Sequence, residues 1–306
     1  MRIVSLLPSA TEMICAIGLA DQLCGVSHEC DYPPAVTSLP RVTKSIVHPD
    51  ASSAEIDRLV SEKSRDEISL YSLDQRLLRE LKPDVIVTQS LCEVCAVAPS
   101  EVQLALESLS LTPRVINLSP TTLGDVLNEI LMLGRTLGHE SAAVSAVDSL
   151  SARIDDVKRR GEAMTDRPGV VLLEWLDPLF TAGHWNPELV RVAGGKELFG
   201  QEGGKSRRIE WSDLQTVDPE CIVVACCGFD VNRSLQDVEQ MTTQPGFLAL
   251  RAVREGKLYV ADGSAYFNRS GPRLVDSLEL LAHAIDPRVH PLPAGLELLC
   301  FSQTDG

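Results

Sequence analysis

Hydrophobic residues in this chain form two kinds of segment that alternate along its length. Short continuous apolar runs are typical of strands buried on both faces of a parallel sheet. They occupy residues 2–6, 23–27, 83–89 and 114–118 in the first half, and 169–175, 218–228 and 257–261 in the second. Segments with a helical period, such as 273–284, lie between them. This alternation predicts an α/β fold of parallel sheets covered by helices.

Residues 121–161 differ from the rest because their apolar residues recur at helical spacing over about forty positions. A helix of that length would extend roughly 60 Å and would contact both halves. Gly134 and Gly138 also allow a kink, or two helices end to end. We therefore predict two α/β lobes joined by one long backbone helix. The predicted parts are residues 1–118, the connecting helix 119–165, residues 166–290 and a loosely held tail, 291–306.

The segments that follow the predicted strands indicate where a ligand binds, because ligands of open α/β sheets bind beyond the carboxyl ends of the strands. These segments hold many of the chain's aromatic residues, cysteines and histidines, which suit a large ring system. Each aromatic residue taken alone has the alternative role of closing its own lobe. The predicted ligand-binding residues, in a cleft between the lobes, are Tyr32, Gln89, His184, Trp185, Phe229, Tyr266, Phe267 and Arg269.

Two features suggest bound metal. His184, beside Trp185, is a candidate axial ligand for a metal-centred macrocycle, although a hydrogen bond to its own loop is an equal alternative. His28, Cys30, Cys92 and Cys95 form a candidate set of four ligands for zinc or an iron–sulfur cluster. The single residue between His28 and Cys30 does not match the usual spacing of a zinc finger.

Composition restricts the partners and the location. The 306 residues carry a formal charge of −15, which argues against nucleic acid and anionic membranes as partners. No run of apolar residues is long enough to span a membrane, and we expect a monomer. The nine cysteines and the amino-terminal sequence predict a cytoplasmic protein with reduced thiols, or a periplasmic one if the true start lies upstream.

No catalytic pattern accompanies these features. Residues 203–206 resemble part of a phosphate-binding loop, but Phe199 stands where that motif needs glycine. A nucleophile elbow is absent as well. The sequence therefore predicts a protein that is not an enzyme.

Several segments resemble substrate-binding proteins of cobalamin and ferric-siderophore ABC importers. They are residues 2–12, 182–185, 193–195 and 246–263, and residues 27–33, 89–97 and 266–269 resemble a branch usually labelled cobalamin-binding protein. The resemblance spans about residues 1–290. It implies a class III periplasmic binding protein-like fold, with a corrin ring between aromatic residues of two lobes and a permease as partner.

Three hypotheses follow. The first is a non-enzymatic protein that binds a corrinoid such as cobalamin, or another metal chelate. The second is a metal or iron–sulfur protein, conceivably a redox enzyme, that uses Cys92, Cys95, Cys30 and His28. The third is an interaction module with an empty cleft.

Overall fold

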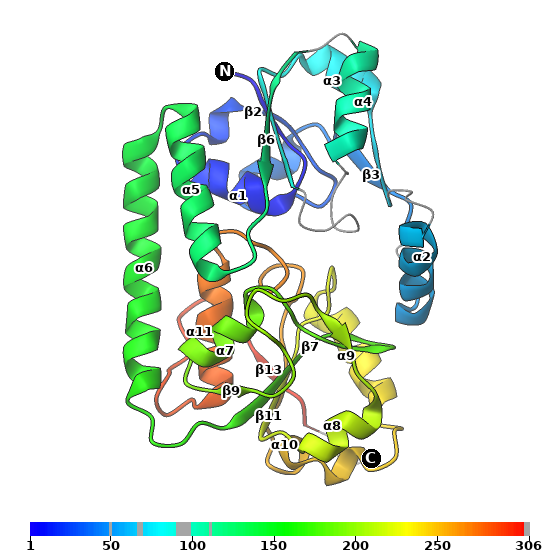
Figure 1. Cartoon of the computed structure of the whole chain (residues 1–306), viewed down its shortest axis with the longest axis vertical. Helices are drawn as coiled ribbons and strands as arrows, with labels where there is room; N and C mark the ends of the chain where they lie inside the picture. Colours follow the sequence, from blue (N-terminus) through cyan, green and yellow to red (C-terminus); the bar gives the residue numbers. More distant parts are fainter. Residues whose placement is uncertain (49–50, 66–69, 90–98, 110–111, 303–306) are drawn as a thin grey trace. The chain divides into compact units, whose positions relative to one another are not determined.

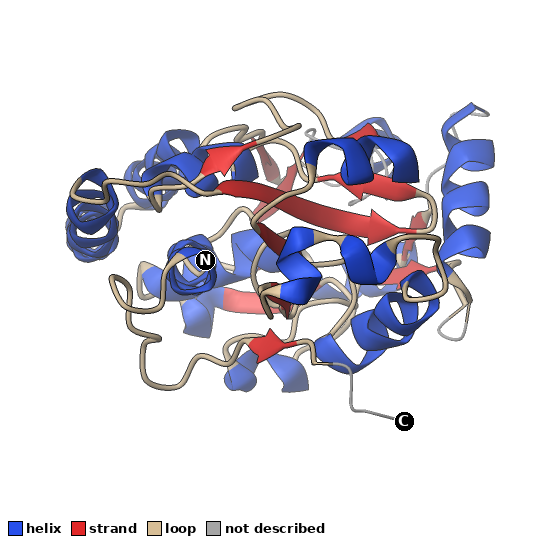
Figure 2. Cartoon of the chain, turned by 90° about the horizontal axis from the view of Figure 1, so that it is seen from below, coloured by secondary structure: helices blue, strands red, loops and turns tan. Residues whose placement is uncertain are grey.

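The computed structural model describes residues 1–48, 51–65, 70–89, 99–109 and 112–302. The chain divides into two compact units. Unit 1 consists of Met1–Pro120 and Gly124–Asp148, and unit 2 of Thr121–Leu123 and Ser149–Gly306. In both units the strands lie between helices (Figure 2). The predicted α/β class is therefore confirmed.

Unit 1 contains a parallel sheet of four strands in the order β2-β1-β5-β6. The strands are β1 (Ile3–Ser5), β2 (Leu23–Val26), β5 (Val85–Gln89) and β6 (Arg114–Leu118). Every residue of β1 and β5 is buried, as their continuous apolar sequence requires. The helices α1 (Pro8–Ala16), α3 (Gln75–Leu81) and α4 (Pro99–Leu109) alternate with these strands along the chain (Figure 1).

An antiparallel pair of strands, β3 (Thr43–Ser45) and β4 (Tyr71–Leu73), extends unit 1 beyond the parallel sheet. The helix α2 (Ser53–Arg65) lies between these two strands in the sequence. Their sequences, Thr-Lys-Ser and Tyr-Ser-Leu, form no continuous apolar run. Neither strand was therefore predicted from the sequence.

The predicted single helix of residues 121–161 is wrong, because the chain breaks at Gly138 and forms two helices. These are α5 (Leu123–Leu137) and α6 (Glu140–Glu162), which lie side by side at their junction (Figure 1). Gly138 adopts a left-handed φ of 78°, which ends the first helix. A Cβ at Gly134 would lie 2.3 Å from the Cβ of Ala143, so glycine permits this close packing. Both helices contribute residues to both units, α5 through Leu123 alone and α6 through a longer part on each side of Ser149.

The sheet of unit 2 has parallel strands at its centre and antiparallel strands at its edges. Its order is β10-β8-β7-β11-β12-β13, and β9 also pairs with β7. The strands β7, β9, β11 and β12 run parallel, whereas β8, β10 and β13 are antiparallel to their neighbours. The ranges are β7 (Gly169–Leu176), β8 (Leu179–Thr181), β9 (Lys196–Glu197), β10 (Arg207–Arg208), β11 (Cys221–Val224), β12 (Leu258–Val260) and β13 (Leu299–Cys300).

Helices complete unit 2, and one of them is tied to α6 by ion pairs. They are α7 (Asn186–Val192), α8 (Trp211–Val217), α9 (Val231–Met241), α10 (Arg251–Arg254) and α11 (Leu274–Ile285). Arg153 of α6 contacts Asp276 at 2.5 Å and Glu279 at 2.6 Å, both in α11. Of the helices formed by described residues, none combines the length and apolar character that a membrane span requires.

The carboxyl-terminal segment is not the loosely held tail that we expected from residue 291 onward. Leu299 and Cys300 form β13, which pairs with Val260 and Tyr259 of β12. The next residue, Phe301, packs against the core of unit 2. The segment up to residue 302 is therefore part of unit 2.

Glu129 of α5 gives unit 1 a pH-dependent stability. One oxygen accepts a hydrogen bond from the Ser119 backbone N–H at 2.5 Å, and the other is buried. Burial raises the pKa of this carboxyl from 4.5 to about 7. Because the folded-state pKa is the higher one, the stabilisation is fully present below about pH 4.5 and is lost as the pH rises through about 7.

The side chain of Glu129→Gln resembles the protonated carboxyl at every pH. The free energy of unfolding of the variant minus that of the wild type should therefore increase by about 1 kcal/mol from pH 5 to pH 8, after allowance for solvent screening. Urea unfolding at both pH values measures the difference. A difference between the two proteins that stays constant with pH would contradict this explanation.

Candidate functional site

The pairing of β7 with β11 places two aromatic rings together at the carboxyl edge of the sheet in unit 2. Val171, Leu173 and Leu176 of β7 belong to the core of unit 2, and Trp175, near the end of the strand, packs against this core. Phe229 lies in the segment after β11. The ring centroids of Trp175 and Phe229 are 5.0 Å apart, a typical spacing for packed aromatic rings. We call these two residues the aromatic shelf.

Backbone hydrogen bonds hold the aromatic shelf in place. The Cys227 N–H donates to the Glu174 carbonyl at 3.0 Å, so that pairing between the two chain segments continues beyond the strands. The Phe229 N–H donates to the Cys226 carbonyl across a turn in which Gly228 has a φ of 74°. This left-handed conformation favours glycine. The shelf is therefore fixed by the sheet and not by a long loop.

Two arginine side chains lie over aromatic rings at this edge. The Arg233 guanidinium, in the first turn of α9, is 4.2 Å from the centroid of Phe229 and pairs with Asp237 at 2.8 Å. The Arg273 guanidinium, next to the start of α11, is 5.5 Å from the centroid of Tyr266. Both distances permit cation–π attraction. The edge thus combines flat apolar surface with two guanidinium groups, of which that of Arg233 already has a carboxylate partner.

The loop after β12 is locked against the end of β11. A Cβ at Gly263 would lie 2.2 Å from the Cys226 carbonyl oxygen, so only glycine fits there. The Asn268 amide donates to the carbonyls of Ala225 and Gly263, each at 3.0 Å. Phe267 and Arg269, predicted to bind ligand, are buried. Tyr266, in the same loop and next to the Arg273 guanidinium, is partly exposed.

Trp185, directly before α7, also contacts this loop. Its indole N–H donates to the Phe267 carbonyl at 2.9 Å, and only 5% of its surface is exposed. This bond positions the loop of residues 263–269. Direct contact between Trp185 and a ligand stays a prediction.

His184 is held by its own backbone in a strained conformation with a φ of 55°. Its N–H donates to the Gly204 carbonyl at 2.6 Å, and its carbonyl accepts from the Gly203 N–H at 2.9 Å. Burial, helped by the charge of Lys205, lowers the pKa of the imidazole. Within the described residues its buried Nδ1 has no hydrogen-bond partner. The side chain is thus suited to the neutral form that binds metals.

Two segments of unit 2 that were predicted to lie at the carboxyl edge of the sheet begin at different places. The turn between β7 and β8 lies at the carboxyl end of β7. Residues 182–185 follow β8, which is antiparallel, and the Ala182 N–H bonds the Leu172 carbonyl in the middle of β7. The sequence alone did not show that β8 reverses direction.

In unit 1 the segment after β2 is fixed by a buried network of hydroxyl and thiol groups. The Thr11 hydroxyl donates to Ser5 at 2.8 Å and lies 3.1 Å from the Cys30 sulfur, which also contacts Ser27 at 3.2 Å. Arg41 donates to the backbone carbonyls of Ser27 and Cys30. Cys30 is therefore already surrounded by hydrogen-bonding groups.

His28 lies beside this network, next to the antiparallel pair β3 and β4. Its Nδ1 is 2.7 Å from the Thr43 hydroxyl oxygen, and its ring centroid is 5.1 Å from that of Tyr71. Burial and then the charge of Arg41 lower the pKa of its imidazole. Tyr32 is 44% exposed, and Gln89 is the buried last residue of β5. Their ligand-binding roles stay predictions.

The proposed zinc or iron–sulfur site receives no support. Cys92 and Cys95 lie outside the described residues. Elsewhere in the described ranges, no three or more histidine, cysteine, aspartate or glutamate side chains are grouped so that they could hold a metal ion. Cys226, which directly precedes Cys227, is part of the hydrophobic core of unit 2.

The sequence analysis missed Trp175, Arg233 and Arg273. Trp175 was assigned only to a strand, although an aromatic residue at a strand end beside the Asp177-Pro178 turn is a recognisable signal. The two arginines stand four residues after Phe229 and seven after Tyr266, at the starts of helices that follow the predicted loops. Their contacts depend on where those helices begin.

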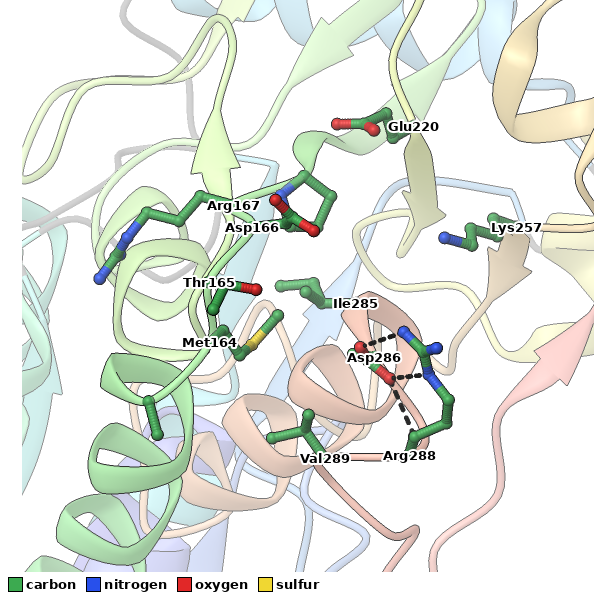
Figure 3. A pocket seen from close by; sticks show the side chains of 12 residues that line it. Met164, Thr165, Asp166, Arg167, Glu220, Lys257, Ile285, Asp286, Arg288 and Val289 are labelled. Atoms are coloured by element: carbon green, nitrogen blue, oxygen red, sulfur yellow. Dashed lines mark hydrogen bonds and ion pairs between the residues drawn. The ribbon is translucent and has the colours of Figure 1, made fainter.

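A surface hollow of about 700 Å³ lies at the opposite edge of the sheet in unit 2 (Figure 3). Its walls include Pro168, Glu220 and Lys257, each directly before a parallel strand. Asp286 and Arg288 form an ion pair within it at 2.8 Å. The hollow is therefore separate from the aromatic shelf, and its charges are of both signs.

Comparisons with known proteins connect this arrangement to a family. An uncharacterized ABC transporter substrate-binding lipoprotein of Bacillus subtilis is 24% identical over 94% of this chain and 80% of its own length. A vitamin B12-binding protein of Vibrio cholerae is 21% identical, over 91% and 86%.

Solved structures show the same fold. A periplasmic heme binding protein of Pseudomonas aeruginosa has a TM-score of 0.74 and 24% identity, and the match covers 100% of this chain and 99% of that one. The periplasmic vitamin B12 binding protein of Vibrio cholerae has a TM-score of 0.65 and 20% identity, with coverage of 93% and 96%. The family model described as periplasmic binding protein matches residues 3–265. Since this match extends over most of the chain, the chain belongs to the periplasmic binding protein family.

Proposed function

We propose that this protein binds a corrinoid such as cobalamin, without changing it chemically, through the aromatic shelf of unit 2. The family consists of ligand-binding proteins and not of enzymes, and this chain is a ligand-binding protein of that kind. The observation that supports a corrinoid as the ligand is the pair Trp175 and Phe229 at the carboxyl edge of the sheet. The relatives named vitamin B12-binding proteins support the choice of ligand.

The shelf suits a large ring for physical reasons. Aromatic side chains offer flat apolar surface, and burial of such surface against a macrocycle is favourable. The sheet already holds both rings in position, so little side-chain freedom is lost on binding. A few polar groups nearby then select among rings of similar size.

A second candidate ligand is an iron porphyrin. Heme carries two carboxylates, whereas the side chains of a corrin ring are mostly neutral amides. The Arg273 guanidinium beside Tyr266 favours an anionic ring. The fold of the Pseudomonas aeruginosa heme binding protein is compatible with this alternative.

We further propose an ABC permease as the partner, because a relative is named as an ABC transporter substrate-binding lipoprotein. A permease receives ligand from its binding protein on one side of the membrane. The cytoplasmic location expected from the sequence stays a prediction, and fractionation of the source cells is its test.

Calorimetric titration of reduced, metal-analysed protein with cobalamin and with hemin tests the proposal. We expect one site per chain for at least one of the two ligands, together with a rise in melting temperature by mass action. Cys92→Ser should leave the affinity unchanged. If neither ligand binds, the proposed function is wrong.

Trp175→Ala and Phe229→Ala should each weaken binding of that ligand about tenfold, because each removes one stacking surface worth about 1 kcal/mol. Trp211→Ala is the matched control, since Trp211 packs on Phe247 and bonds the Pro245 carbonyl, away from the shelf. Equal loss of affinity in all three variants would show that the effect is not local to the shelf.

Arg273→Gln distinguishes the two ligands. It should weaken binding of hemin about tenfold and binding of cobalamin less, because hemin has two carboxylates on its ring, whereas the single anionic group of cobalamin is a phosphodiester outside the corrin ring. Competition between the two ligands on the wild type and the variant measures this. A larger loss for cobalamin than for hemin would contradict the assignment of Arg273 to an anionic group.

A further inference from the structure

A short segment between β6 and α5 belongs to a different unit from the residues on either side of it. Thr121–Leu123 belongs to unit 2, although Pro120 and Gly124 on either side belong to unit 1. We call residues 119–123 the crossover strap. The chain therefore enters unit 2 for three residues and returns before α6 leads into unit 2 again.

The far end of the crossover strap is anchored by Glu188 of α7. The Leu123 N–H opens α5 and is one of the helix donors that have no partner within the helix. It donates to the Glu188 carboxylate at 2.9 Å, across 65 positions of the sequence. A carboxylate is favourable at a helix amino terminus because of the helix dipole. Glu188 thus acts as a tertiary cap for α5.

The first residue of the strap, Ser119, also donates to a carboxylate. Glu129, in the second turn of α5, accepts from the Ser119 N–H at 2.5 Å within unit 1. The strap is therefore bonded at each end to a different glutamate, and removal of Glu188 frees only the end that lies in unit 2.

The middle of the strap lies close to Gly203, which is hydrogen-bonded to His184. A Cβ built at Gly203 would lie 3.8 Å from the Thr122 side chain and 3.9 Å from the Thr121 side chain. The Gly203 N–H donates to the His184 carbonyl, and the His184 N–H donates to the Gly204 carbonyl. Packed and hydrogen-bonded groups of this kind are able to transmit a local change.

Glu202, which shares an arginine with Glu188, provides a control variant at the same surface. Arg191 lies 3.7 Å from Glu188 and 2.5 Å from Glu202. Glu202 shares this arginine, and among the described residues it forms its hydrogen bonds with Arg191 and not with the strap. Its removal therefore changes the same charge cluster without removing the anchor.

We propose that Glu188 is a positioning residue, which anchors the crossover strap and thereby steadies the segment of His184 and Trp185. Only its effect on ligand retention rests on the proposed function. Loosening of the strap should increase the motion of His184, whose backbone is strained, and through Trp185 the motion of the loop at Phe267.

Amide hydrogen exchange of ligand-free protein tests the anchor directly. In Glu188→Ala the amides of Leu123 and His184 should exchange about tenfold faster, as expected for loss of one hydrogen bond to a charged group. Glu188→Gln keeps an oxygen acceptor and should remain close to the wild type, as should Glu202→Ala. Urea unfolding of each variant reports whether the whole fold has changed.

The outcomes separate the steps of the proposal. Unchanged exchange at Leu123 in Glu188→Ala would overturn the anchor. Faster exchange at Leu123 without a change at His184 would overturn the coupling. An equal increase in Glu202→Ala would assign the effect to general charge and overturn the role of Glu188.

Ligand dissociation adds a separate measurement. Cobalamin or hemin, whichever binds the wild type, should leave Glu188→Ala about tenfold faster than the wild type, and Glu188→Gln should restore slow release. An unchanged dissociation rate would overturn the role in ligand retention. If the wild type binds neither ligand, the proposed function fails, and the exchange measurements still decide whether Glu188 anchors the strap.

Discussion

The parallel pairing of β7 with β11 is the constraint on which the candidate site depends. Because both strands end at the same edge, Trp175 at the end of one and Phe229 after the other are brought to within 5.0 Å. The backbone bonds that extend this pairing, such as Cys227 to Glu174, fix the rings without any contribution from the ligand. The site is thus a consequence of the fold and is preorganised.

The parts of the fold that depend on long apolar runs could be predicted from the sequence. The buried strands β5 and β11 were found because a strand covered on both faces must be apolar throughout. The strands β3 and β4 were missed, since polar residues interrupt them and they form no apolar run. The break at Gly138 was only an alternative, because a glycine near a helix end and a glycine inside a helix look alike in a sequence.

The candidate site was harder to predict than the fold. The loop of residues 264–269 was found from its position after a strand, but the sequence did not show that Phe267 is buried while its carbonyl accepts from Trp185. The arginines near the shelf were missed because their contacts depend on the direction in which α9 and α11 leave the loops. Side-chain positions of this kind require tertiary structure.

Several bonds in unit 2 suggest why a binding protein would need so many fixed loops. Backbone hydrogen bonds join His184 to Gly203 and Gly204, the crossover strap lies close to Gly203, and Trp185 donates to the loop after β12. Each such bond reduces the disorder that a ligand would otherwise have to remove. Selectivity for one macrocycle then depends on a small number of side chains at the rim of a rigid surface.

The central claim is that the aromatic shelf contacts the ligand, and a crystal structure of the protein with cobalamin or hemin bound is the most direct measurement. The account predicts that the macrocycle stacks on Trp175 or Phe229, with ring planes about 3.5–4 Å apart. A ligand bound at the opposite edge of the sheet, in the hollow beside Glu220 and Lys257, would contradict it.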